Sequence, residues 1–147
     1  ISARPYHHTC ALIAGGSVKC LGSNSVGELG DGTTATAWTP VTMVGVAGVS
    51  AVTLGYGHSC VIVAGGTVAC RGSNNFGQLG DDTLVPSIDP VQVQQLTGAT
   101  AVSAGYEHTC ALRADTKVTC WGFNRSGQLG RGFASETARS NEVVAGT

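Results

Sequence analysis

The chain repeats itself with a period of fifty residues, and this periodicity constrains its fold more than any other feature. A shift of fifty places superimposes two cysteines of each copy without any change of register, Cys10, Cys60 and Cys110, and Cys20, Cys70 and Cys120. The same shift superimposes a histidine and an asparagine of each copy: His8, His58 and His108, and Asn24, Asn74 and Asn124. Self-similarity at a fixed period of about 20 to 50 residues indicates a solenoid, a propeller or another repeat array.

Each repeat has the pattern of four short β-strands. In the first copy, residues 8–13 and 17–21 are rich in apolar and β-branched side chains and flank one alanine and two glycines, as in a tight hairpin loop. A turn-rich connection follows, and two further strands are predicted at 41–44 and 49–54. No segment has the periodicity of an amphipathic helix. The pattern predicts an all-β chain of three four-stranded antiparallel propeller blades, at about residues 1–50, 51–100 and 101–147.

The cysteine positions agree with these hairpins. Cys10 and Cys20 lie symmetrically about Gly15, so they face each other across the first hairpin. Directly opposed residues of antiparallel strands have Cα atoms about 4.5 to 5.5 Å apart, which is within the range that a disulfide spans. Six cysteines allow many connectivities, but only pairing within each hairpin repeats with the period. We therefore predict three disulfides: Cys10–Cys20, Cys60–Cys70 and Cys110–Cys120.

The third copy contains the clearest family motif. It reads His-Thr-Cys-Ala-Leu at 108–112, Val-Thr-Cys-Trp-Gly at 118–122 and Asn-Arg-Ser-Gly-Gln-Leu-Gly at 124–130. This string resembles the repeat of the regulator of chromosome condensation family, and all three copies match it. The resemblance implies a ring of usually about seven blades that binds partners through the loops at its two rims. It also implies that the periodic histidines are blade-core residues whose ring nitrogens satisfy buried backbone groups.

Two departures from the family pattern stand out. Leu21 and Arg71 occupy the position of Trp121, and Arg131 replaces the acidic residue that follows the glycine-rich turn in the other copies. Three blades also cannot close a ring, and each end of such an arc exposes an apolar sheet face that is normally covered. We expect either a homodimer that forms a six-bladed ring or further repeats outside this sequence to complete it.

Composition limits the classes of partner that the protein can bind and the cellular compartment in which we expect it. The net charge of −1 and the pI near 6.4 lack the basic footprint that nucleic acids require. No apolar run approaches the roughly 18 residues that a membrane-spanning helix needs. Repeated disulfides belong in an oxidising compartment, and the paired cysteines resemble exported bacterial members of the family. We therefore expect a secreted or cell-surface protein, bacterial in origin, with no nucleic-acid partner and no membrane insertion.

The sequence shows no catalytic or metal-binding pattern. The histidine two residues before a cysteine in each copy could suggest metal sites, but the cysteine pairs lack the short separation of structural zinc ligands. No paired carboxylates, catalytic triad or unpaired reactive cysteine is evident. The glycine-rich stretches lack the lysine of a phosphate loop, so we interpret them as turns in which Asn24, Asn74 and Asn124 bond the backbone. We predict a protein that is not an enzyme and needs no cofactor or metal.

Residues that break the repeat are the candidates for binding, because structural demands explain those that obey it. They include aromatic and arginine side chains, which are enriched at interface hot spots: Trp38, Phe76, Arg125, Arg131, Phe133 and Arg139. The preferred function is a scaffold that recognises a protein partner through its rim loops. One alternative is a glycan-binding lectin, which Trp38, Leu84 and Phe133 disfavour because they are not equivalent positions. The other is a structural module of a larger surface protein or assembly.

Overall fold

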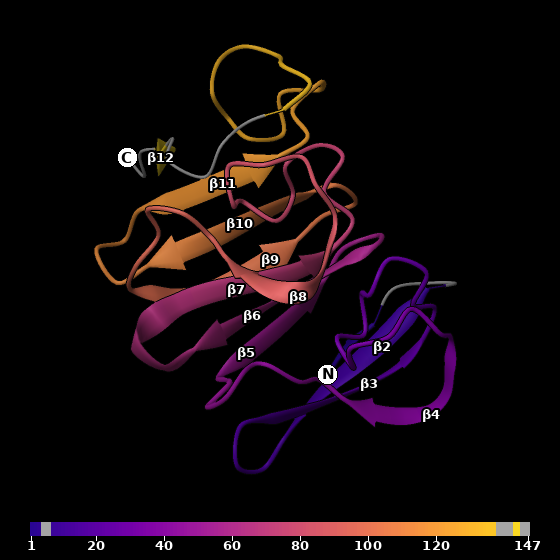
Figure 1. Cartoon of the computed structure of the whole chain (residues 1–147). Helices are drawn as coiled ribbons and strands as arrows, with labels where there is room; N and C mark the ends of the chain where they lie inside the picture. The colour runs from indigo at the N-terminus through magenta and orange to yellow at the C-terminus, as the bar shows by residue number, and fades with distance from the viewer. Residues whose placement is uncertain (4–6, 138–142, 145–147) are drawn as a thin grey trace.

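Three four-stranded antiparallel sheets make up the fold, and they follow one another in chain order (Figure 1). The computed structural model describes residues 1–3, 7–137 and 143–144. Blade 1 contains β1 (Ser2–Ala3), β2 (His8–Ile13), β3 (Ser17–Gly22) and β4 (Ala37–Thr42). Blade 2 contains β5 (Ala51–Leu54), β6 (His58–Val63), β7 (Thr67–Gly72) and β8 (Ser87–Gln92). Blade 3 contains β9 (Ala99–Ala104), β10 (His108–Arg113), β11 (Val118–Gly122) and β12 (Val143–Val144).

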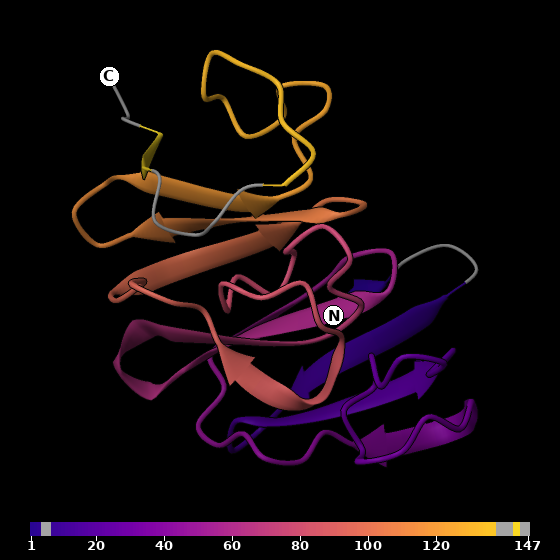
Figure 2. The ribbon, with the colours of Figure 1, turned by 45° about the horizontal axis from the view of Figure 1, so that its top comes forward.

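Each blade is an antiparallel meander in which strands consecutive in sequence are neighbours in the sheet. The strand expected at 49–54 is present as β5, but it pairs with the hairpin that follows it, from Ala51 opposite Ile62 to Leu54 opposite Ser59. It is therefore the first strand of the next blade. The sheets are stacked as successive layers, as the tilted view shows (Figure 2). This is the architecture of an arc of propeller blades.

The outer strand begins earlier than the sequence pattern predicted. The expected strand at 41–44 is β4, which starts at Ala37 and includes Pro40. Proline lacks a backbone donor, which is tolerated on an edge strand or at a bulge. Both conditions hold, since β4 lies at the edge of its sheet and its register with β3 shifts between Cys20 and Gly22.

The hairpins place the cysteines opposite each other. Cys10 pairs with Cys20, Cys60 with Cys70 and Cys110 with Cys120, each with Cα atoms 4.1 Å apart. All six cysteines are bonded in the pairing that the hairpin symmetry predicts. The first hairpin turns through Gly15 and Gly16, whose φ angles of 83° and 74° favour glycine. In the second hairpin the turn is a short 3₁₀ helix, η1 (Ala64–Gly66).

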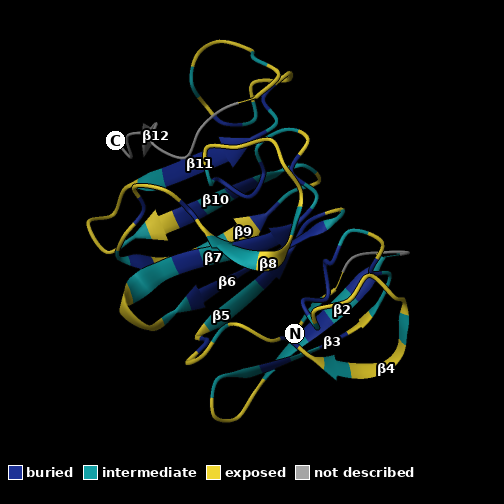
Figure 3. Ribbon diagram, in the orientation of Figure 1, coloured by how far each residue is buried: buried dark blue, intermediate teal, exposed yellow. Residues whose placement is uncertain are grey.

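The hydrophobic core lies between neighbouring blades. One cluster joins Cys10, Cys20 and Leu29 of blade 1 to Val61 of blade 2. A second cluster joins residues of blades 2 and 3, including Cys60, Cys70, Ile62, Ala111 and Trp121. The strands of the central hairpin are mostly buried, whereas the outer strands β4 and β8 are largely exposed or half-buried (Figure 3). No helix in the described part of the chain is long and apolar enough to cross a membrane.

Candidate functional site: the tyrosine rim

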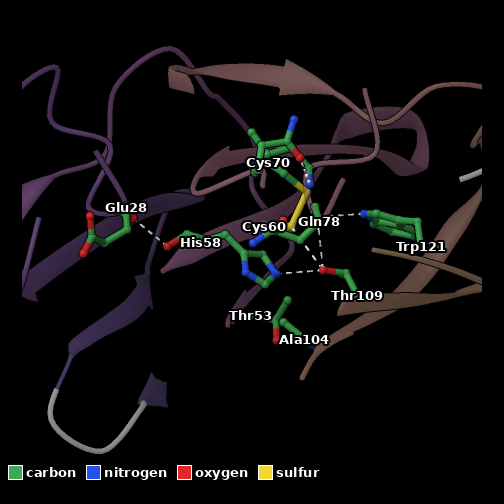
Figure 4. The surroundings of a disulfide bond; sticks show 12 residues. Glu28, Thr53, His58, Cys60, Cys70, Gln78, Ala104, Thr109 and Trp121 are labelled. Carbon is green, nitrogen blue, oxygen red and sulfur yellow. Dashed lines mark hydrogen bonds between the residues drawn. A yellow bond between two sulfur atoms is a disulfide. The ribbon is translucent and has the colours of Figure 1, made fainter. Parts of the chain in front are cut away.

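A hydrogen-bond relay connects blade 2 to blade 3. The Nε2 atom of His58 lies 2.9 Å from the hydroxyl of Thr109. The Thr109 hydroxyl in turn lies 3.5 Å from the backbone carbonyl of Gln78. Figure 4 shows His58 pointing at Thr109 beside the Cys60–Cys70 disulfide. The Thr109 hydroxyl of blade 3 thus bridges the histidine and a loop of blade 2.

The same relay connects blade 1 to blade 2. His8 Nε2 lies 2.9 Å from the Ser59 hydroxyl, which donates to the carbonyl of Glu28 at 2.6 Å. His8 and Ser59 are both almost completely buried. The sequence interpretation assigned the ring nitrogens to backbone groups, but for Nε2 the partner is a hydroxyl of the following blade. The periodic histidine is therefore part of the interface between blades.

The turn that recurs after each hairpin is organised by its buried asparagine. The side-chain oxygens of Asn24, Asn74 and Asn124 accept hydrogen bonds from the backbone of Leu29, Leu79 and Leu129 at 2.9 to 3.0 Å. In blade 1 the Asn24 amide also donates to Asp31, and in blade 3 the Asn124 amide donates to the carbonyl of Phe133. These contacts are structural, and they fix the shape of the long loops on one rim.

That rim carries the connection before each hairpin and the long loop after it. Backbone hydrogen bonds join the two segments in every blade: Ser23 donates to His7, Ser73 to Gly57 and Phe123 to Glu107. The opposite rim carries the short hairpin turns, where Val49 donates to Gly16. The rim with the long loops is called the tyrosine rim below, because it presents Tyr56 and Tyr106.

Tyr56 and Tyr106 form a stacked pair. Their ring centroids are 4.1 Å apart with an interplanar angle of 24°, and the ring of His7 meets Tyr56 edge-on at 4.1 Å. The backbone N–H of Tyr56 donates to the carbonyl of Tyr106 at 2.9 Å, so two blades hold the pair in place. The side chains nevertheless remain 40% and 57% exposed. Large exposed aromatic groups on a fixed backbone are typical of recognition surfaces.

Glu107 and two phenylalanines adjoin the pair. Partial burial raises the pKa of the Glu107 carboxyl above its ordinary value. A hydrogen bond with the Tyr56 side chain, burial and the charge of Glu107 together raise the pKa of Tyr106. Phe76 of blade 2 contacts Phe123 of blade 3 edge-to-face at 4.8 Å, and the backbone N–H of Phe123 donates to the carbonyl of Glu107. The rim therefore combines aromatic surface with one carboxyl group.

The six candidates from the sequence do not form one site. Trp38 and Phe133 are strongly exposed, but they lie on blades 1 and 3, which blade 2 separates. Phe76 packs between loops, as just described. The exposed Arg125 forms an ion pair with Glu136 at 3.0 Å, and Arg131 donates to the carbonyl of Cys120. Arg139 lies outside the described residues.

Sequence reasoning missed the tyrosines, although a signal was present. The fifty-residue shift superimposes Tyr56 on Tyr106 and on a tyrosine at position 6. Because the tyrosines recur at the same position in every copy, a search for residues that differ between the copies does not find them. Among the described residues, no group of three or more histidine, cysteine or acidic side chains could hold a metal ion.

The blades, their meander topology and the relay between them define a protein of the β-propeller repeat class. Sequence models of the regulator of chromosome condensation (RCC1) repeat match residues 49–78, 66–112 and 99–128. The chain belongs to the RCC1 repeat family. A search of curated protein sequences finds no significant match.

Solved structures share the fold. Yeast Prp20, the RCC1 protein of Saccharomyces cerevisiae, superposes with a TM-score of 0.82 at 19% identity in its complex with Kap60, over 96% of this chain and 36% of that one. A second structure of Prp20 gives 0.82 at 18% identity, over 96% of this chain and 37% of that one. Human WBSCR16 gives 0.75 at 19% identity, over 90% of this chain and 35% of that one. The chain therefore spans about a third of the length of these relatives.

Proposed function

We propose that this chain is a non-catalytic scaffold that binds a protein partner through the tyrosine rim. The observation that carries the proposal is the stacked Tyr56–Tyr106 pair, which is exposed although two blades fix its backbone. A preorganised aromatic surface loses little conformational entropy on binding. One of the Prp20 structures is described together with binding to Gsp1p and histones, so a protein of this fold binds other proteins.

The proposed compartment is the cell surface or the extracellular medium of a bacterium. All six cysteines are consumed in disulfides, one in each hairpin. Repeated structural disulfides persist in oxidising environments and are rare in the cytosol. The chain is proposed to be one partial propeller domain of three repeats, completed by a second copy or by further repeats.

A glycan is the second candidate ligand, because exposed tyrosines stand at equivalent positions of successive blades. The flat apolar faces of sugar rings stack on aromatic rings, and the Glu107 carboxyl beside Tyr106 could accept hydrogen bonds from sugar hydroxyls. A lectin was disfavoured because Trp38, Leu84 and Phe133 do not fall on one position of the repeat. The tyrosines do fall on one position, so that argument does not apply to them. The third role, a structural module of a larger surface assembly, makes no use of the tyrosine rim.

The test compares the wild-type chain with the double variant Tyr56→Ser/Tyr106→Ser. A matched control, Ile13→Ser, removes an exposed apolar side chain beside the hairpin turn of blade 1, on the opposite rim. Each protein is immobilised and exposed to secreted bacterial proteins and to a glycan array. Partners retained by the wild type and the control but lost by the tyrosine variant support the proposal and identify the ligand class. Equal retention by all three proteins would rule out the tyrosine rim as the binding surface.

A further inference from the structure

The rim between blades 2 and 3 departs from the repeat at a set of neighbouring positions. Phe76 of blade 2 and Phe123 of blade 3, called the phenylalanine pair below, lie there with Glu107. The equivalent positions between blades 1 and 2 hold smaller side chains: Val26, Ser73 and Gly57. The backbone is the same in both places, because the N–H of Ser73 donates to Gly57 and the N–H fifty positions later does the same. The fold therefore forms at this place without two phenylalanines and a glutamate.

The equivalent glycine indicates where the side chain of Glu107 starts. A Cβ atom at Gly57 would lie 3.5 Å from the side chain of Ser73 and 3.8 Å from that of Val26. Fifty positions later, the counterparts of these two side chains are the phenylalanine pair, whose ring centroids are 4.8 Å apart. The side chain of Glu107 therefore leaves the backbone beside that pair, in the seam between blades 2 and 3.

Tyrosine rings add a second aromatic surface beside this carboxyl group. Tyr106 directly precedes Glu107 in the chain, and its exposed ring stacks on Tyr56 of blade 2. The pKa of Tyr106 is raised by its hydrogen bond with Tyr56, by burial, and by the charges of Tyr56 and Glu107, so the carboxyl acts on this phenol. The phenylalanine pair is half-buried and still partly open to solvent. Glu107 thus adjoins aromatic rings of both blades.

The carboxyl group of Glu107 has no cationic partner among the described residues. The ion pairs in that part of the chain join other side chains: Arg113 and Lys117 with Asp115, and Arg125 with Glu136. Partial burial raises the pKa of Glu107, because the charged form loses hydration and gains no counterion. A cation from outside the chain would supply the missing charge, and the faces of aromatic rings attract cations as well.

We propose that Glu107, Tyr106 and the phenylalanine pair bind a lysine or arginine side chain from a basic segment of a protein partner. This inference rests on the proposed scaffold role and names the chemistry that the tyrosine rim recognises. The cationic head of the ligand would pair with the carboxylate, and its methylene stem would cover the aromatic rings. A neutral sugar would leave the charge of the carboxylate uncompensated, so a basic peptide fits these observations better than a glycan.

The first test uses a pair of fluorescent peptides, one rich in arginine and one in which citrulline, a neutral isostere, replaces every arginine. Fluorescence anisotropy at low ionic strength is expected to show that the wild-type chain binds the arginine peptide and not the citrulline peptide. Glu107→Gln keeps the shape of the side chain and should weaken binding by about tenfold. The matched control, Asp115→Asn, removes a charge from the opposite rim and should bind as the wild type does. Equal binding of both peptides, no binding of either, or normal binding by Glu107→Gln would overturn the proposal.

The second test concerns the phenylalanine pair. Phe76→Val/Phe123→Ser copies the equivalent positions between blades 1 and 2, so we expect the variant to fold, which circular dichroism checks. It should bind the arginine peptide severalfold more weakly, because the aromatic faces beside the carboxylate are lost. Trp38→Ser is the control, since it removes an exposed aromatic ring from the outer strand of blade 1. A folded double variant that binds the peptide as the wild type does would contradict the proposed site.

The outcomes also separate this inference from the scaffold role. A protein partner that the double tyrosine variant loses but Glu107→Gln retains would leave the scaffold role intact and show that the cation site is wrong. A wild-type chain that distinguishes the peptides through Glu107 but retains no secreted protein would leave the cation site without the scaffold role. A sugar whose binding requires Glu107, with no preference for the arginine peptide, would assign the carboxyl to a glycan and overturn the inference.

Discussion

Arg71 and Trp121 occupy the same position in successive blades, and both reach back to a carbonyl of the preceding blade. Arg71 Nη1 donates to Gly30 at 3.0 Å, and Trp121 Nε1 donates to Gln78 at 2.9 Å. Both side chains are almost completely buried. One interface is therefore filled by a charged group and the other by an indole. Substitutions at these two positions compare how much each kind of side chain stabilises the contact between blades.

Arg71→Trp is expected to stabilise the protein. Burial lowers the pKa of Arg71 to about 10, although the charge of Asp89 opposes this effect. Its Nη2 atom has no hydrogen-bond partner in the part of the chain that the structure describes. Replacing a buried charge by a well-packed apolar group is typically neutral or stabilising by about 1 to 4 kcal/mol. Urea unfolding measures the change, with the exposed Arg125→Trp as control. A variant that is less stable by more than about 1 kcal/mol would show that the arginine is well accommodated.

Trp121→Phe is expected to lower the free energy of unfolding by about 1 to 3 kcal/mol, because the Gln78 carbonyl loses its indole donor and keeps only the longer bond from the Thr109 hydroxyl. The matched control is Trp38→Phe, which changes the same side chain at a site that is 89% exposed. Denaturant unfolding of both variants, at concentrations where the chain is monomeric, measures the difference. Equal effects would mean that the hydrogen bond across the blades contributes nothing.

Thr109→Val tests the relay. The substitution keeps the shape of the side chain but removes the hydroxyl between His58 and Gln78, so we expect a loss of about 1 to 3 kcal/mol. Thr119→Val is the control, since the buried Thr119 hydroxyl has no hydrogen-bond partner among the described residues. That variant should be neutral or more stable. The reverse order of stabilities would contradict the assignment of the relay.

Glu107→Gln should change the pH dependence of stability. The folded-state pKa of Glu107 is raised by burial, so the folded state binds its proton more tightly than the unfolded state. As the pH rises from the unfolded-state pKa of Glu107 through its raised folded-state pKa, this group therefore lowers the stability of the fold. At higher pH the loss of stability remains. We expect the variant to melt above the wild type at pH 7 and to match it below about pH 4. A difference that is constant across this range would exclude titration of Glu107 as its cause.

The sequence alone was sufficient for the repeat, the hairpins and the disulfides, because each depends on local spacing. Residues 8–13 match β2, and Cys10 and Cys20 are symmetric about the turn that joins their strands. The outer strand was predicted at 41–44, which is too late, because a proline usually marks the boundary of a strand, whereas β4 includes Pro40 at a sheet edge.

The contacts between blades could not be predicted in the same way. The partner of His58 is Thr109, which lies 51 positions away and in a different sheet. A repeat pattern shows that two residues are equivalent, but it does not show which face of a blade each residue occupies. For the same reason a search for residues that differ between the repeats does not consider the periodic tyrosines, although Tyr56 and Tyr106 are the exposed aromatic pair.

The arrangement of the cysteines tests the central claim most directly, because the hairpins, the blade interfaces and the proposed compartment all depend on it. Unreduced protein is digested and the linked peptides are identified by mass spectrometry, together with a count of free thiols. We predict no free thiols and three links, Cys10–Cys20, Cys60–Cys70 and Cys110–Cys120. Links between cysteines of different hairpins, or six free thiols in protein from its native compartment, would contradict the account.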